Sequence, residues 1–391
     1  MSAIPEQNNK INQKKESAEK KAVKKRIKPK YILLILITAL LIYICFLFLH
    51  EPDYVPKAWE SYDIRNRSEG FESITPVSEM HTIDISPYSN PETVVYHDGY
   101  LYASVDESKI IRIKEDGSDL KKLLSTDGKI LGFEVDDEDT IWFTDVYHSG
   151  VYRADSANHY QIETVVSGAP LNYPDAICLS KDQSKIYISD ATVVKVKEEK
   201  NGAVNASNTD LLAHTMSGRV YCYDLNTKEL TEIASGFSFC NGIQLSEDEK
   251  YLYVNETSGN RIWKVNIQNK DKEIFLDALP GFPDNMSERG EGIYWTGFAS
   301  PENVTYTSLS NKVLLRKVIL NLPYHLRNIL MNTGDSTTTF FAFNEEGEIL
   351  YYVNTDQFNY GTTTGIIQVN SRLYIHHLNG SQCIGYIDLQ N

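Results

Sequence analysis

The sequence predicts an all-β fold, a six-bladed β-propeller, with a single transmembrane helix near its N-terminus. A short strand-like pattern recurs six times after residue 96, and the copies start about 40 to 45 residues apart where the chain is uninterrupted. Residues 31–49 contain no charged side chain, and the 30 residues before them are strongly basic. The repeat is typical of a propeller, and the uncharged segment next to basic residues is typical of a membrane anchor.

The recurring pattern is an apolar residue, then Tyr or Trp, then an apolar or small residue. Because each copy alternates and is rich in β-branched and aromatic residues, each is expected to form a strand, often followed by a second one. A β-sandwich rarely needs more than about 250 residues, and no helical segments alternate with the strands as an α/β fold would require. The six copies are "YLYAS" (100–104), "TIWFTD" (140–145), "KIYISD" (185–190), "YLYVNE" (251–256), "GIYWTG" (292–297) and "RLYIHH" (372–377).

Two gaps in the repeat are wider than the others. Residues 195–210 are polar, and residues 310–330 have apolar residues near helical spacing, so the second gap is expected to hold a helix or lid over one face. The first strand of a closed propeller often completes the last blade. "HTIDIS" (81–86) is therefore expected to pair beside "CIGYID" near the C-terminus.

The N-terminal part is expected to be an anchor with a cytoplasmic tail. Residues 1–30 hold ten Lys or Arg and three Glu, whereas the whole chain has a net charge of −15, so the remainder carries −22. Nineteen helical residues span roughly 28 Å, close to the thickness of a bilayer's hydrocarbon core. A cleavable signal peptide would have a shorter apolar core and small residues at its cleavage site, which this segment does not have.

The predicted organisation is a basic cytoplasmic tail (1–30), a signal anchor (31–49), a stalk (50–80) and the propeller (81–391). The positive-inside rule makes the chain a single-pass type II membrane protein with a lumenal or extracellular propeller. Sequons that would make it a glycoprotein on that side of the membrane occur at Asn66, Asn205, Asn255, Asn285, Asn303 and Asn379.

The composition also bounds the partners. The acidic lumenal part argues against a nucleic-acid partner and is compatible with calcium. The five cysteines have no zinc-like spacing, and their pairing cannot be deduced. No G-x-S-x-G, H-E-x-x-H, P-loop or Rossmann glycine pattern occurs in the sequence.

Polar residues stand next to the expected inner strands of four blades. Six blades around one axis bring equivalent loops together, so residues far apart in sequence can converge on the channel mouth. Carboxylates and amide carbonyls make an oxygen-only site, which suits calcium better than zinc. The alternative is that each is an ordinary turn residue. The candidate metal ligands are Glu92, Asp175, Asn241, Asp284 and Asn285.

From about residue 88 to its end, the chain resembles the strictosidine synthase-like family. The resemblance rests on "PDAICLSKDQSKIYISDA", "SGRVYCYDL", "FCNGIQLSEDEKYLYVNETSGNRIWKV", "LPGFPDNM" and "TTTGIIQVNSRLYIHHLNG". It is most specific over residues 218–297 and looser over 298–350. It implies membership of the wider propeller group that includes paraoxonases, gluconolactonases and diisopropylfluorophosphatase.

The resemblance implies calcium ligands at Glu92, Asn241, Asp284 and Asn285. Where the family has Asn or Asp before an Asp, this chain has Pro174 followed by Asp175, so Asp175 or Asn172 is expected to substitute.

Other catalytic positions depart from the family. Gly365 stands where strictosidine synthase has its glutamate base, and Leu131 and Asp145 stand where paraoxonases have a histidine dyad, with His148 nearby. Of the pair His376 and His377, at most one is expected to face the channel, because adjacent strand residues point to opposite faces.

These features predict a membrane-anchored, calcium-dependent hydrolase of esters or lactones, similar to an arylesterase, in which Asp284 acts as general base or nucleophile. Strictosidine synthase activity itself is disfavoured. The expected partners are a small-molecule ester or lactone and a membrane through residues 31–49. The alternative is a non-catalytic scaffold that binds a protein on the propeller rim.

Overall fold

The computed structural model describes residues 28–198, 201–302, 304–331, 337–358, 360–378 and 380–389. The chain divides into two compact units, Met1–His50 and Glu51–Asn391. In the first unit, helix α2 (Pro29–Leu49) begins with a proline in its first turn and is long and apolar enough to cross a membrane, with a mean hydropathy of 3.2. Most of the predicted basic tail lies outside the described residues.

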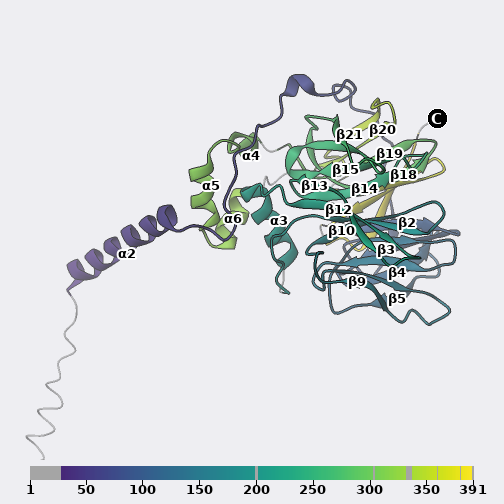
Figure 1. The fold of residues 1–391 in the computed structure, drawn as a ribbon, viewed down its shortest axis with the longest axis horizontal. Coiled ribbons are helices and arrows are strands. Elements are labelled where there is room, and N and C mark those ends of the chain that lie inside the picture. Colours follow the sequence, from purple (N-terminus) through teal and green to yellow (C-terminus); the bar gives the residue numbers. More distant parts are fainter. Residues whose placement is uncertain are drawn as a thin grey trace, which may run out of the picture. The chain divides into compact units, whose positions relative to one another are not determined.

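The second unit is a six-bladed β-propeller, as the repeat predicted (Figure 1). Each blade is a sheet of four antiparallel strands. The blades are β2 (Thr93–His97), β3 (Tyr100–Val105), β4 (Lys109–Lys114), β5 (Lys121–Ser125); β6 (Ile130–Val135), β7 (Ile141–Asp145), β8 (Gly150–Ala154), β9 (Glu163–Ser167); β10 (Pro174–Leu179), β11 (Lys185–Asp190), β12 (Gly218–Asp224), β13 (Leu230–Phe237); β14 (Cys240–Leu245), β15 (Tyr251–Glu256), β16 (Arg261–Asn266), β17 (Lys272–Leu276); β18 (Gly281–Gly290), β19 (Ile293–Pro301), β20 (Thr338–Asn344), β21 (Ile349–Thr355); and β22 (Thr363–Val369), β23 (Arg372–His377), β24 (Cys383–Asp388), β1 (His81–Asp84).

The sixth blade is closed by the two ends of the propeller sequence. Strand β1 pairs antiparallel with β24, with His81 opposite Tyr386 and Asp84 opposite Cys383. The predicted pairing of "HTIDIS" beside "CIGYID" is therefore confirmed. This pairing makes β1 the outermost strand of the sixth blade, so one blade contains both ends of the propeller sequence and closes the ring.

The recurring aromatic motif forms the second strand of each blade, not the innermost strand. The motif strands are β3, β7, β11, β15, β19 and β23, and the strand before each lines the central channel. Second strands pack between neighbouring blades, as the buried Trp295 and Tyr374 do, so they carry large apolar side chains. The innermost strands also contain apolar residues, such as Val94, Ile177 and Ile366, but these strands lack the recurring Tyr or Trp and so repeat less visibly in the sequence.

Four helices fill the two wide gaps and gather at one end of the propeller (Figure 1). In the first gap, α3 (Gly202–Ala213) forms in a stretch described from the sequence only as polar. The second gap holds α4 (Val304–Ser308), α5 (Val313–Leu320) and α6 (Tyr324–Met331), which agrees with the expected helix or lid. Two single 3₁₀ turns are η1 (Ile64–Asn66) and η2 (Thr257–Gly259).

Residues 51–80, expected as a stalk, lie along the propeller. The Lys57 amide donates to the Ala213 carbonyl at the end of α3 (2.9 Å), and the Thr75 amide donates to the Tyr352 carbonyl in β21 (2.6 Å). Phe71 is buried against Phe341 and Tyr352. This segment therefore contributes to the core of the second unit.

Candidate metal centre at the propeller hub

The hub is the ring of residues at the helix-covered end of the innermost strands. Of those strands, β6, β10, β14, β18 and β22 each have a register shift at the hub. In β18 the shift lies between Pro283 and Met286, so Asp284 and Asn285 sit in the bulge. A bulge places extra residues opposite the partner strand and changes where side chains point. Asp284 and Asn285 are thus released from strict alternation to opposite faces.

Three carboxylates, Glu92, Asp175 and Asp284, are brought together at this hub. Asp175 is 7% exposed, and burial together with the charges of Asp284 and Glu92 raises its pKa well above the ordinary value. Burial and the Glu92 charge raise the pKa of Asp284 to about 8. Burial also raises the pKa of Glu92. The Glu92 charge therefore disfavours ionisation of both Asp175 and Asp284, although the three residues belong to different blades.

The two predicted amide ligands lie at the same place. Asn241 Nδ2 donates to Asp284 Oδ1 (2.7 Å), and Asn285 Nδ2 is 3.4 Å from the Glu92 carbonyl oxygen. Asn241 is buried, and its Oδ1 has no hydrogen-bond partner within the described part of the chain. Rotation of this amide by about 180° would point Oδ1 to where Nδ2 now lies, so Asn241 can present an oxygen beside Asp284.

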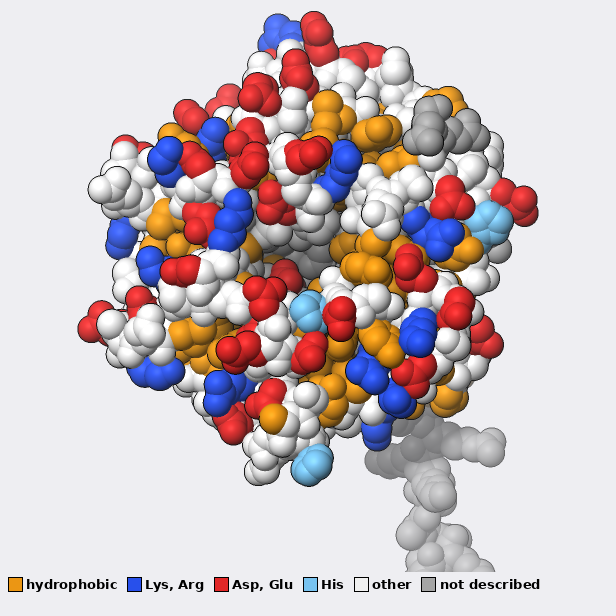
Figure 2. All heavy atoms as spheres, turned by 90° about the vertical axis from the view of Figure 1, so that its right-hand side faces the viewer, with side chains coloured by type: hydrophobic (Ala, Val, Ile, Leu, Met, Phe, Trp, Pro, Cys, Tyr) orange, Lys and Arg blue, Asp and Glu red, His pale blue; other side chains and the backbone are white. Residues whose placement is uncertain are grey.

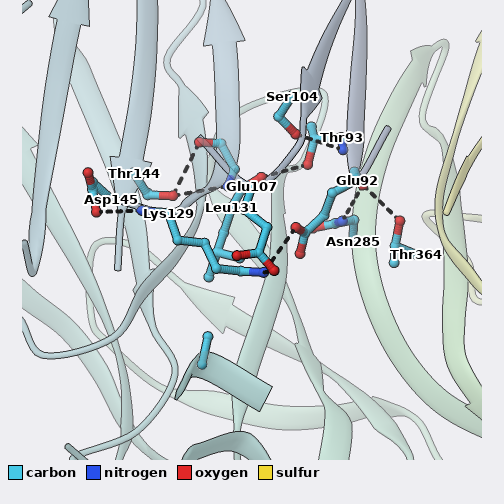
Figure 3. Close-up of polar contacts among 12 residues, drawn as sticks. Glu92, Thr93, Ser104, Glu107, Lys129, Leu131, Thr144, Asp145, Asn285 and Thr364 are labelled. Atoms are coloured by element: carbon cyan, nitrogen blue, oxygen red, sulfur yellow. Dashed lines mark hydrogen bonds and ion pairs between the residues drawn. The ribbon is translucent and has the colours of Figure 1, made fainter. Parts of the chain in front are cut away.

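Lys129 is a fourth charged group at the hub, and the sequence analysis did not consider it. Its ammonium group lies 3.7 Å from Glu92 Oε2 and 3.6 Å from Glu107 Oε1, and its side chain is only 6% exposed. Figure 3 shows the Lys129 and Glu92 side chains pointing toward one another, with Glu107 beside them. Lys129 directly precedes β6 as Glu92 precedes β2, so the equal offset was a usable sequence signal.

Hydrogen bonds between neighbouring blades fix the backbone of the hub. Thr93 Oγ1 donates to the Leu131 carbonyl (2.7 Å), and Thr364 Oγ1 donates to the Glu92 carbonyl (2.7 Å; Figure 3). Asn255 Nδ2 donates to the Asp284 carbonyl (2.6 Å). Each donor belongs to one blade and each acceptor to the next, so the hub side chains are held on a rigid ring.

The donor set fits a hard cation in chemistry but is not closed around one point. In the described residues, no three His, Cys, Asp or Glu side chains are grouped closely enough to hold a metal ion. Nevertheless, of the three buried carboxylates only Glu92 pairs with the buried Lys129, and within the described residues Glu92 Oε2 and Asn241 Oδ1 have no hydrogen-bond partner. Buried charges of this kind are costly unless they are paired or coordinate a metal. Oxygen-only donors are those that calcium takes.

A central cavity of about 400 Å³ lies below the hub, within the ring of innermost strands. Thr93 and Asn285 line it at the hub end, and Glu134 and Glu288 line it farther along the strands. Figure 2 shows the face of the propeller opposite the helices, with a hollow at its centre and acidic side chains around it. A small molecule in this cavity would contact Asn285.

An apolar cluster covers the hub on its other side, beneath the helices. It includes Tyr173, Phe239, Phe282 and Tyr306, all buried. The cover is incomplete, because the Glu92 side chain is 13% exposed. The hub is therefore a polar site between an apolar cover and an open channel.

Gly365 explains why a strictosidine synthase-type base is absent from this chain. A Cβ at position 365 would lie 2.7 Å from His376 Nδ1 and 2.9 Å from Asn285 Cβ. The imidazole of His376 thus takes the space of a residue-365 side chain. His376 lines the cavity, whereas the His377 ring packs against the Tyr360 ring, tilted by 58° with the ring centres 4.0 Å apart, so one histidine of the pair faces the channel.

The residues at the expected paraoxonase-type positions have structural roles here. Leu131 belongs to the apolar cover of the hub. The Asp145 carboxylate accepts the Lys129 amide (3.1 Å) and contacts His148 Nδ1 (2.9 Å), so it holds the segment that carries Lys129. Asn172 donates to the Thr192 and Val194 carbonyls, which leaves Asp175 as the hub carboxylate of its blade.

Comparison with known proteins confirms the resemblance that the sequence suggested. Residues 194–341 match the SMP-30/gluconolactonase/LRE-like region. The adipocyte plasma membrane-associated protein of Salmo salar is 27% identical over 258 residues, covering 59% of this chain and 60% of that protein. The strictosidine synthase-like 6 protein of Arabidopsis thaliana is 26% identical over 230 residues, covering 57% of this chain and 59% of that protein. The match thus spans about 60% of the length of these homologues.

Solved structures share the fold at low sequence identity. A gluconolactonase from Xanthomonas campestris has a TM-score of 0.55 and 17% identity, covering 87% of this chain and 96% of that one. Regucalcin, a calcium-binding protein from Agrobacterium tumefaciens, has a TM-score of 0.54 and 12% identity, covering 81% of this chain and 97% of that one. Both comparisons support the six-bladed propeller.

Proposed function

We propose that this protein is a membrane-anchored, calcium-dependent hydrolase of esters or lactones. One observation carries the proposal: Glu92, Asp175 and Asp284 are buried near Lys129, next to a cavity of about 400 Å³ that is large enough for a small molecule. The match to a gluconolactonase-like region and the fold shared with a gluconolactonase and with regucalcin support the same class.

Glu92, Asp175, Asn241, Asp284 and Asn285 are the residues that would hold calcium. Bound calcium would supply a Lewis acid that polarises the substrate carbonyl and stabilises developing negative charge. Asn285 reaches both the hub and the cavity, so it would orient the carbonyl oxygen. Asp284, its neighbour in the bulge, is our candidate for activating the attacking water. The apolar cover would limit water on the opposite side.

Calcium titration of the full chain in detergent tests this proposal. We expect heat of binding by isothermal titration calorimetry and a rise in melting temperature, because a ligand of the native state adds about 2.7 kcal/mol of stability at 100 times its Kd. Turnover of phenyl acetate and of a δ-lactone should require calcium. Absence of both binding and a melting shift at millimolar calcium would remove the proposal.

Asp284→Asn is the sharpest variant. It removes one of three mutually repelling carboxylates, so with a chelator the variant should melt at or above the wild-type temperature. With calcium it should gain less stability than wild type and lose ester turnover. Asp116→Asn is the matched control, since Asp116 accepts hydrogen bonds only within an exposed turn. Equal calcium-induced shifts in Asp284→Asn and wild type would contradict the ligand assignment.

A second candidate is a non-catalytic propeller that binds a protein on its rim. The ion pair of Lys129 with Glu92 favours it, because the lysine already neutralises part of the hub. Calcium-independent stability combined with no hydrolysis of either substrate would select this function over the hydrolase.

A further inference from the structure

Helices α5 and α6 form a surface that is separate from the candidate metal centre at the hub. Residues 304–331 contain four basic residues and no acidic one, although the chain after residue 30 carries −22. The four are Lys312, Arg316, Lys317 and Arg327. Of these four, only Lys312 is exposed, because Arg316 is fully buried and Lys317 pairs with Glu51, so the segment differs from the acidic propeller exterior mainly in lacking negative charge.

The orientation of α5 is fixed by a buried arginine. Arg316 is fully buried and donates to the Leu212 carbonyl (2.8 Å), the Lys57 carbonyl (2.5 Å) and the Ser310 carbonyl (3.0 Å). Its guanidinium also lies 4.4 Å from the centre of the Trp59 ring. These contacts prevent α5 from turning its other face inward.

The opposite face of α5 is apolar and exposed. Leu314 is 58% exposed and Leu315 is 47% exposed, while Ile319 and Leu320 face the interior with Arg316. With about 100° between successive helical residues, Leu314 lies roughly opposite Arg316. The helix therefore presents leucines to solvent in its only stable orientation.

Helix α6 extends this apolar surface. Ile329 is 70% exposed and Leu326 is 40% exposed, and a spacing of three residues places them on one helix face. Arg327 donates to the Leu320 and Leu322 carbonyls, which ties α6 to the end of α5. We call the surface of Leu314, Leu315, Leu326 and Ile329, with the exposed Lys312 beside it, the cap surface.

The cap surface is tied to the first residues after α2. Glu51 is the second residue after the end of α2 and pairs with Lys317 of α5. Tyr54 packs on the cluster beneath α5 that contains Leu309, Ile319 and Leu320. The segment that leaves the candidate membrane span thus enters the propeller at the cap.

We propose that the cap surface docks onto the phospholipid bilayer that α2 spans, so that this protein has a second, interfacial membrane contact. Exposed leucine and isoleucine beside a basic residue, here Lys312, are what an interfacial helix buries at the headgroup boundary. Residues 304–331 contain no acidic side chain, and the neighbouring Glu51 is paired with Lys317, so repulsion from headgroup phosphates is small. A soluble protein partner is the competing occupant, and the covalent tie to α2 favours the bilayer. The inference depends on α2 crossing a membrane and is independent of hydrolysis.

Depth-dependent quenching in the full chain tests this. The chain is reconstituted in phosphatidylcholine vesicles with a dansyl-bearing amino acid at position 329, and quenching by lipids brominated on their acyl chains is measured. Position 36 in α2 calibrates full immersion. Position 274 in β17 is the matched control, because Ile274 is also an exposed isoleucine but lies on a blade. We expect quenching at 329 to approach that at 36 and to be absent at 274.

The double variant Leu314→Glu, Leu315→Glu separates docking from folding. Both side chains are exposed, so the melting temperature should stay unchanged while quenching at position 329 falls to the level at 274. Ile274→Glu should leave quenching at 329 intact. Quenching at 329 no greater than at 274 in the wild-type background overturns the proposal. A label at 329 that is shielded from aqueous iodide but not quenched by brominated lipid also overturns it, because the cap would then contact protein.

Discussion

At the scale of single residues, Lys129 sets the charge of the hub. Its ammonium group lies between Glu92 and Glu107 and lowers the pKa of both Glu92 and Asp175 relative to what burial alone would give. A bound divalent cation would be repelled by this fixed positive charge. Lys129 is therefore expected to weaken calcium binding while stabilising the calcium-free hub.

The variant Lys129→Met tests that role. Calcium affinity should rise about tenfold, equivalent to about 1.4 kcal/mol of relieved repulsion, and stability with a chelator should fall because Glu92 loses its buried partner. Isothermal titration calorimetry and melting of the full chain measure the two effects. Lys121→Met removes an exposed ion pair with Asp119 and serves as the control. Unchanged or weaker calcium binding in Lys129→Met would show that the lysine does not oppose a cation.

His214 gives the fold a pH dependence away from the hub. It is buried against Trp59 with a ring separation of 4.2 Å, and burial together with the charges of Arg316, Arg261 and Lys57 lowers its pKa to about 3. Its unfolded pKa is near 6.5, so the unfolded state takes up the proton first as pH falls. Stability from His214 is therefore complete above pH 6.5 and lost toward pH 3, by about 1.4 kcal/mol per pH unit.

Asp210 makes stability depend on pH in the opposite direction, so its contribution must be distinguished from that of His214. Burial raises the pKa of Asp210 to about 6, so its contribution is present below pH 3.8 and lost as pH rises through 6. Asn suits the left-handed backbone at position 214, where φ is 50°. In His214→Asn, the pH dependence of stability contributed by His214 is therefore lost, and that contributed by Asp210 remains. The difference in melting temperature between wild type and variant should therefore narrow from pH 7 to pH 5. A constant difference would contradict this assignment.

At the scale of elements, the bulges of the innermost strands explain what sequence reasoning could and could not give. Asp175, Asn241 and Asp284 were found because they stand at similar offsets before strands. The period-2 rule alone could not show that the neighbours Asp284 and Asn285 both lie at the hub, because the register shift depends on pairing with β19. Lys129 was passed over since a lysine is not a metal ligand, although its offset matches Glu92. Likewise, the aromatic repeat identified the six blades, but it corresponds to the second strand of each blade and not to the innermost strand.

The approach of β14 to β18 gives an element-scale prediction. A Cβ at Gly242 would lie 2.4 Å from the Asp284 carbonyl oxygen, which is backbone of the next blade and cannot rotate away. Gly242→Ala should therefore destabilise the fold by about 1–3 kcal/mol and displace the bulge that carries Asp284. The rise in melting temperature on adding calcium should also be smaller in Gly242→Ala than in wild type, because the displaced bulge would misplace Asp284. Ala154→Gly in β8 is the control for a backbone change remote from the hub, because Ala154 is buried and lies opposite Ile141, at the end of its blade away from the hub. A Gly242→Ala protein with wild-type melting and calcium response would refute this packing argument.

At the scale of the whole molecule, the fold was more predictable than the site. Blade number followed from a periodic pattern, and closure by β1 followed from the common arrangement in which the first strand of a closed propeller completes its last blade. The path of residues 51–80 and the positions of the cap helices depend on contacts between residues distant in sequence, such as Arg316 with Lys57, which no local pattern reveals.

The sequons differ in their exposure. Asn255 is fully buried and donates to the Asp284 carbonyl, Asn303 and Asn379 lie outside the described residues, and Asn66 is exposed on η1.

Glycosylation at Asn66 therefore reports the topology of the whole chain. With ten basic residues in the first 30, the tail is expected to stay in the cytoplasm and the acidic remainder to cross, which puts Asn66 on the side where glycans are added. Expression in membranes that glycosylate should give a form that shifts on treatment with peptide N-glycosidase, and Asn66→Gln should remove that part of the shift. Ser68→Ala removes the same sequon without changing Asn66 and must give the same result.

Replacing the lysines of residues 20–30 with glutamate should make a fraction of the chains insert in the opposite orientation and lower glycan occupancy at Asn66, because the charge difference across α2 is then reversed. Full occupancy after charge reversal would show that the basic tail does not determine orientation, and no occupancy in the wild-type chain would place the propeller in the cytoplasm.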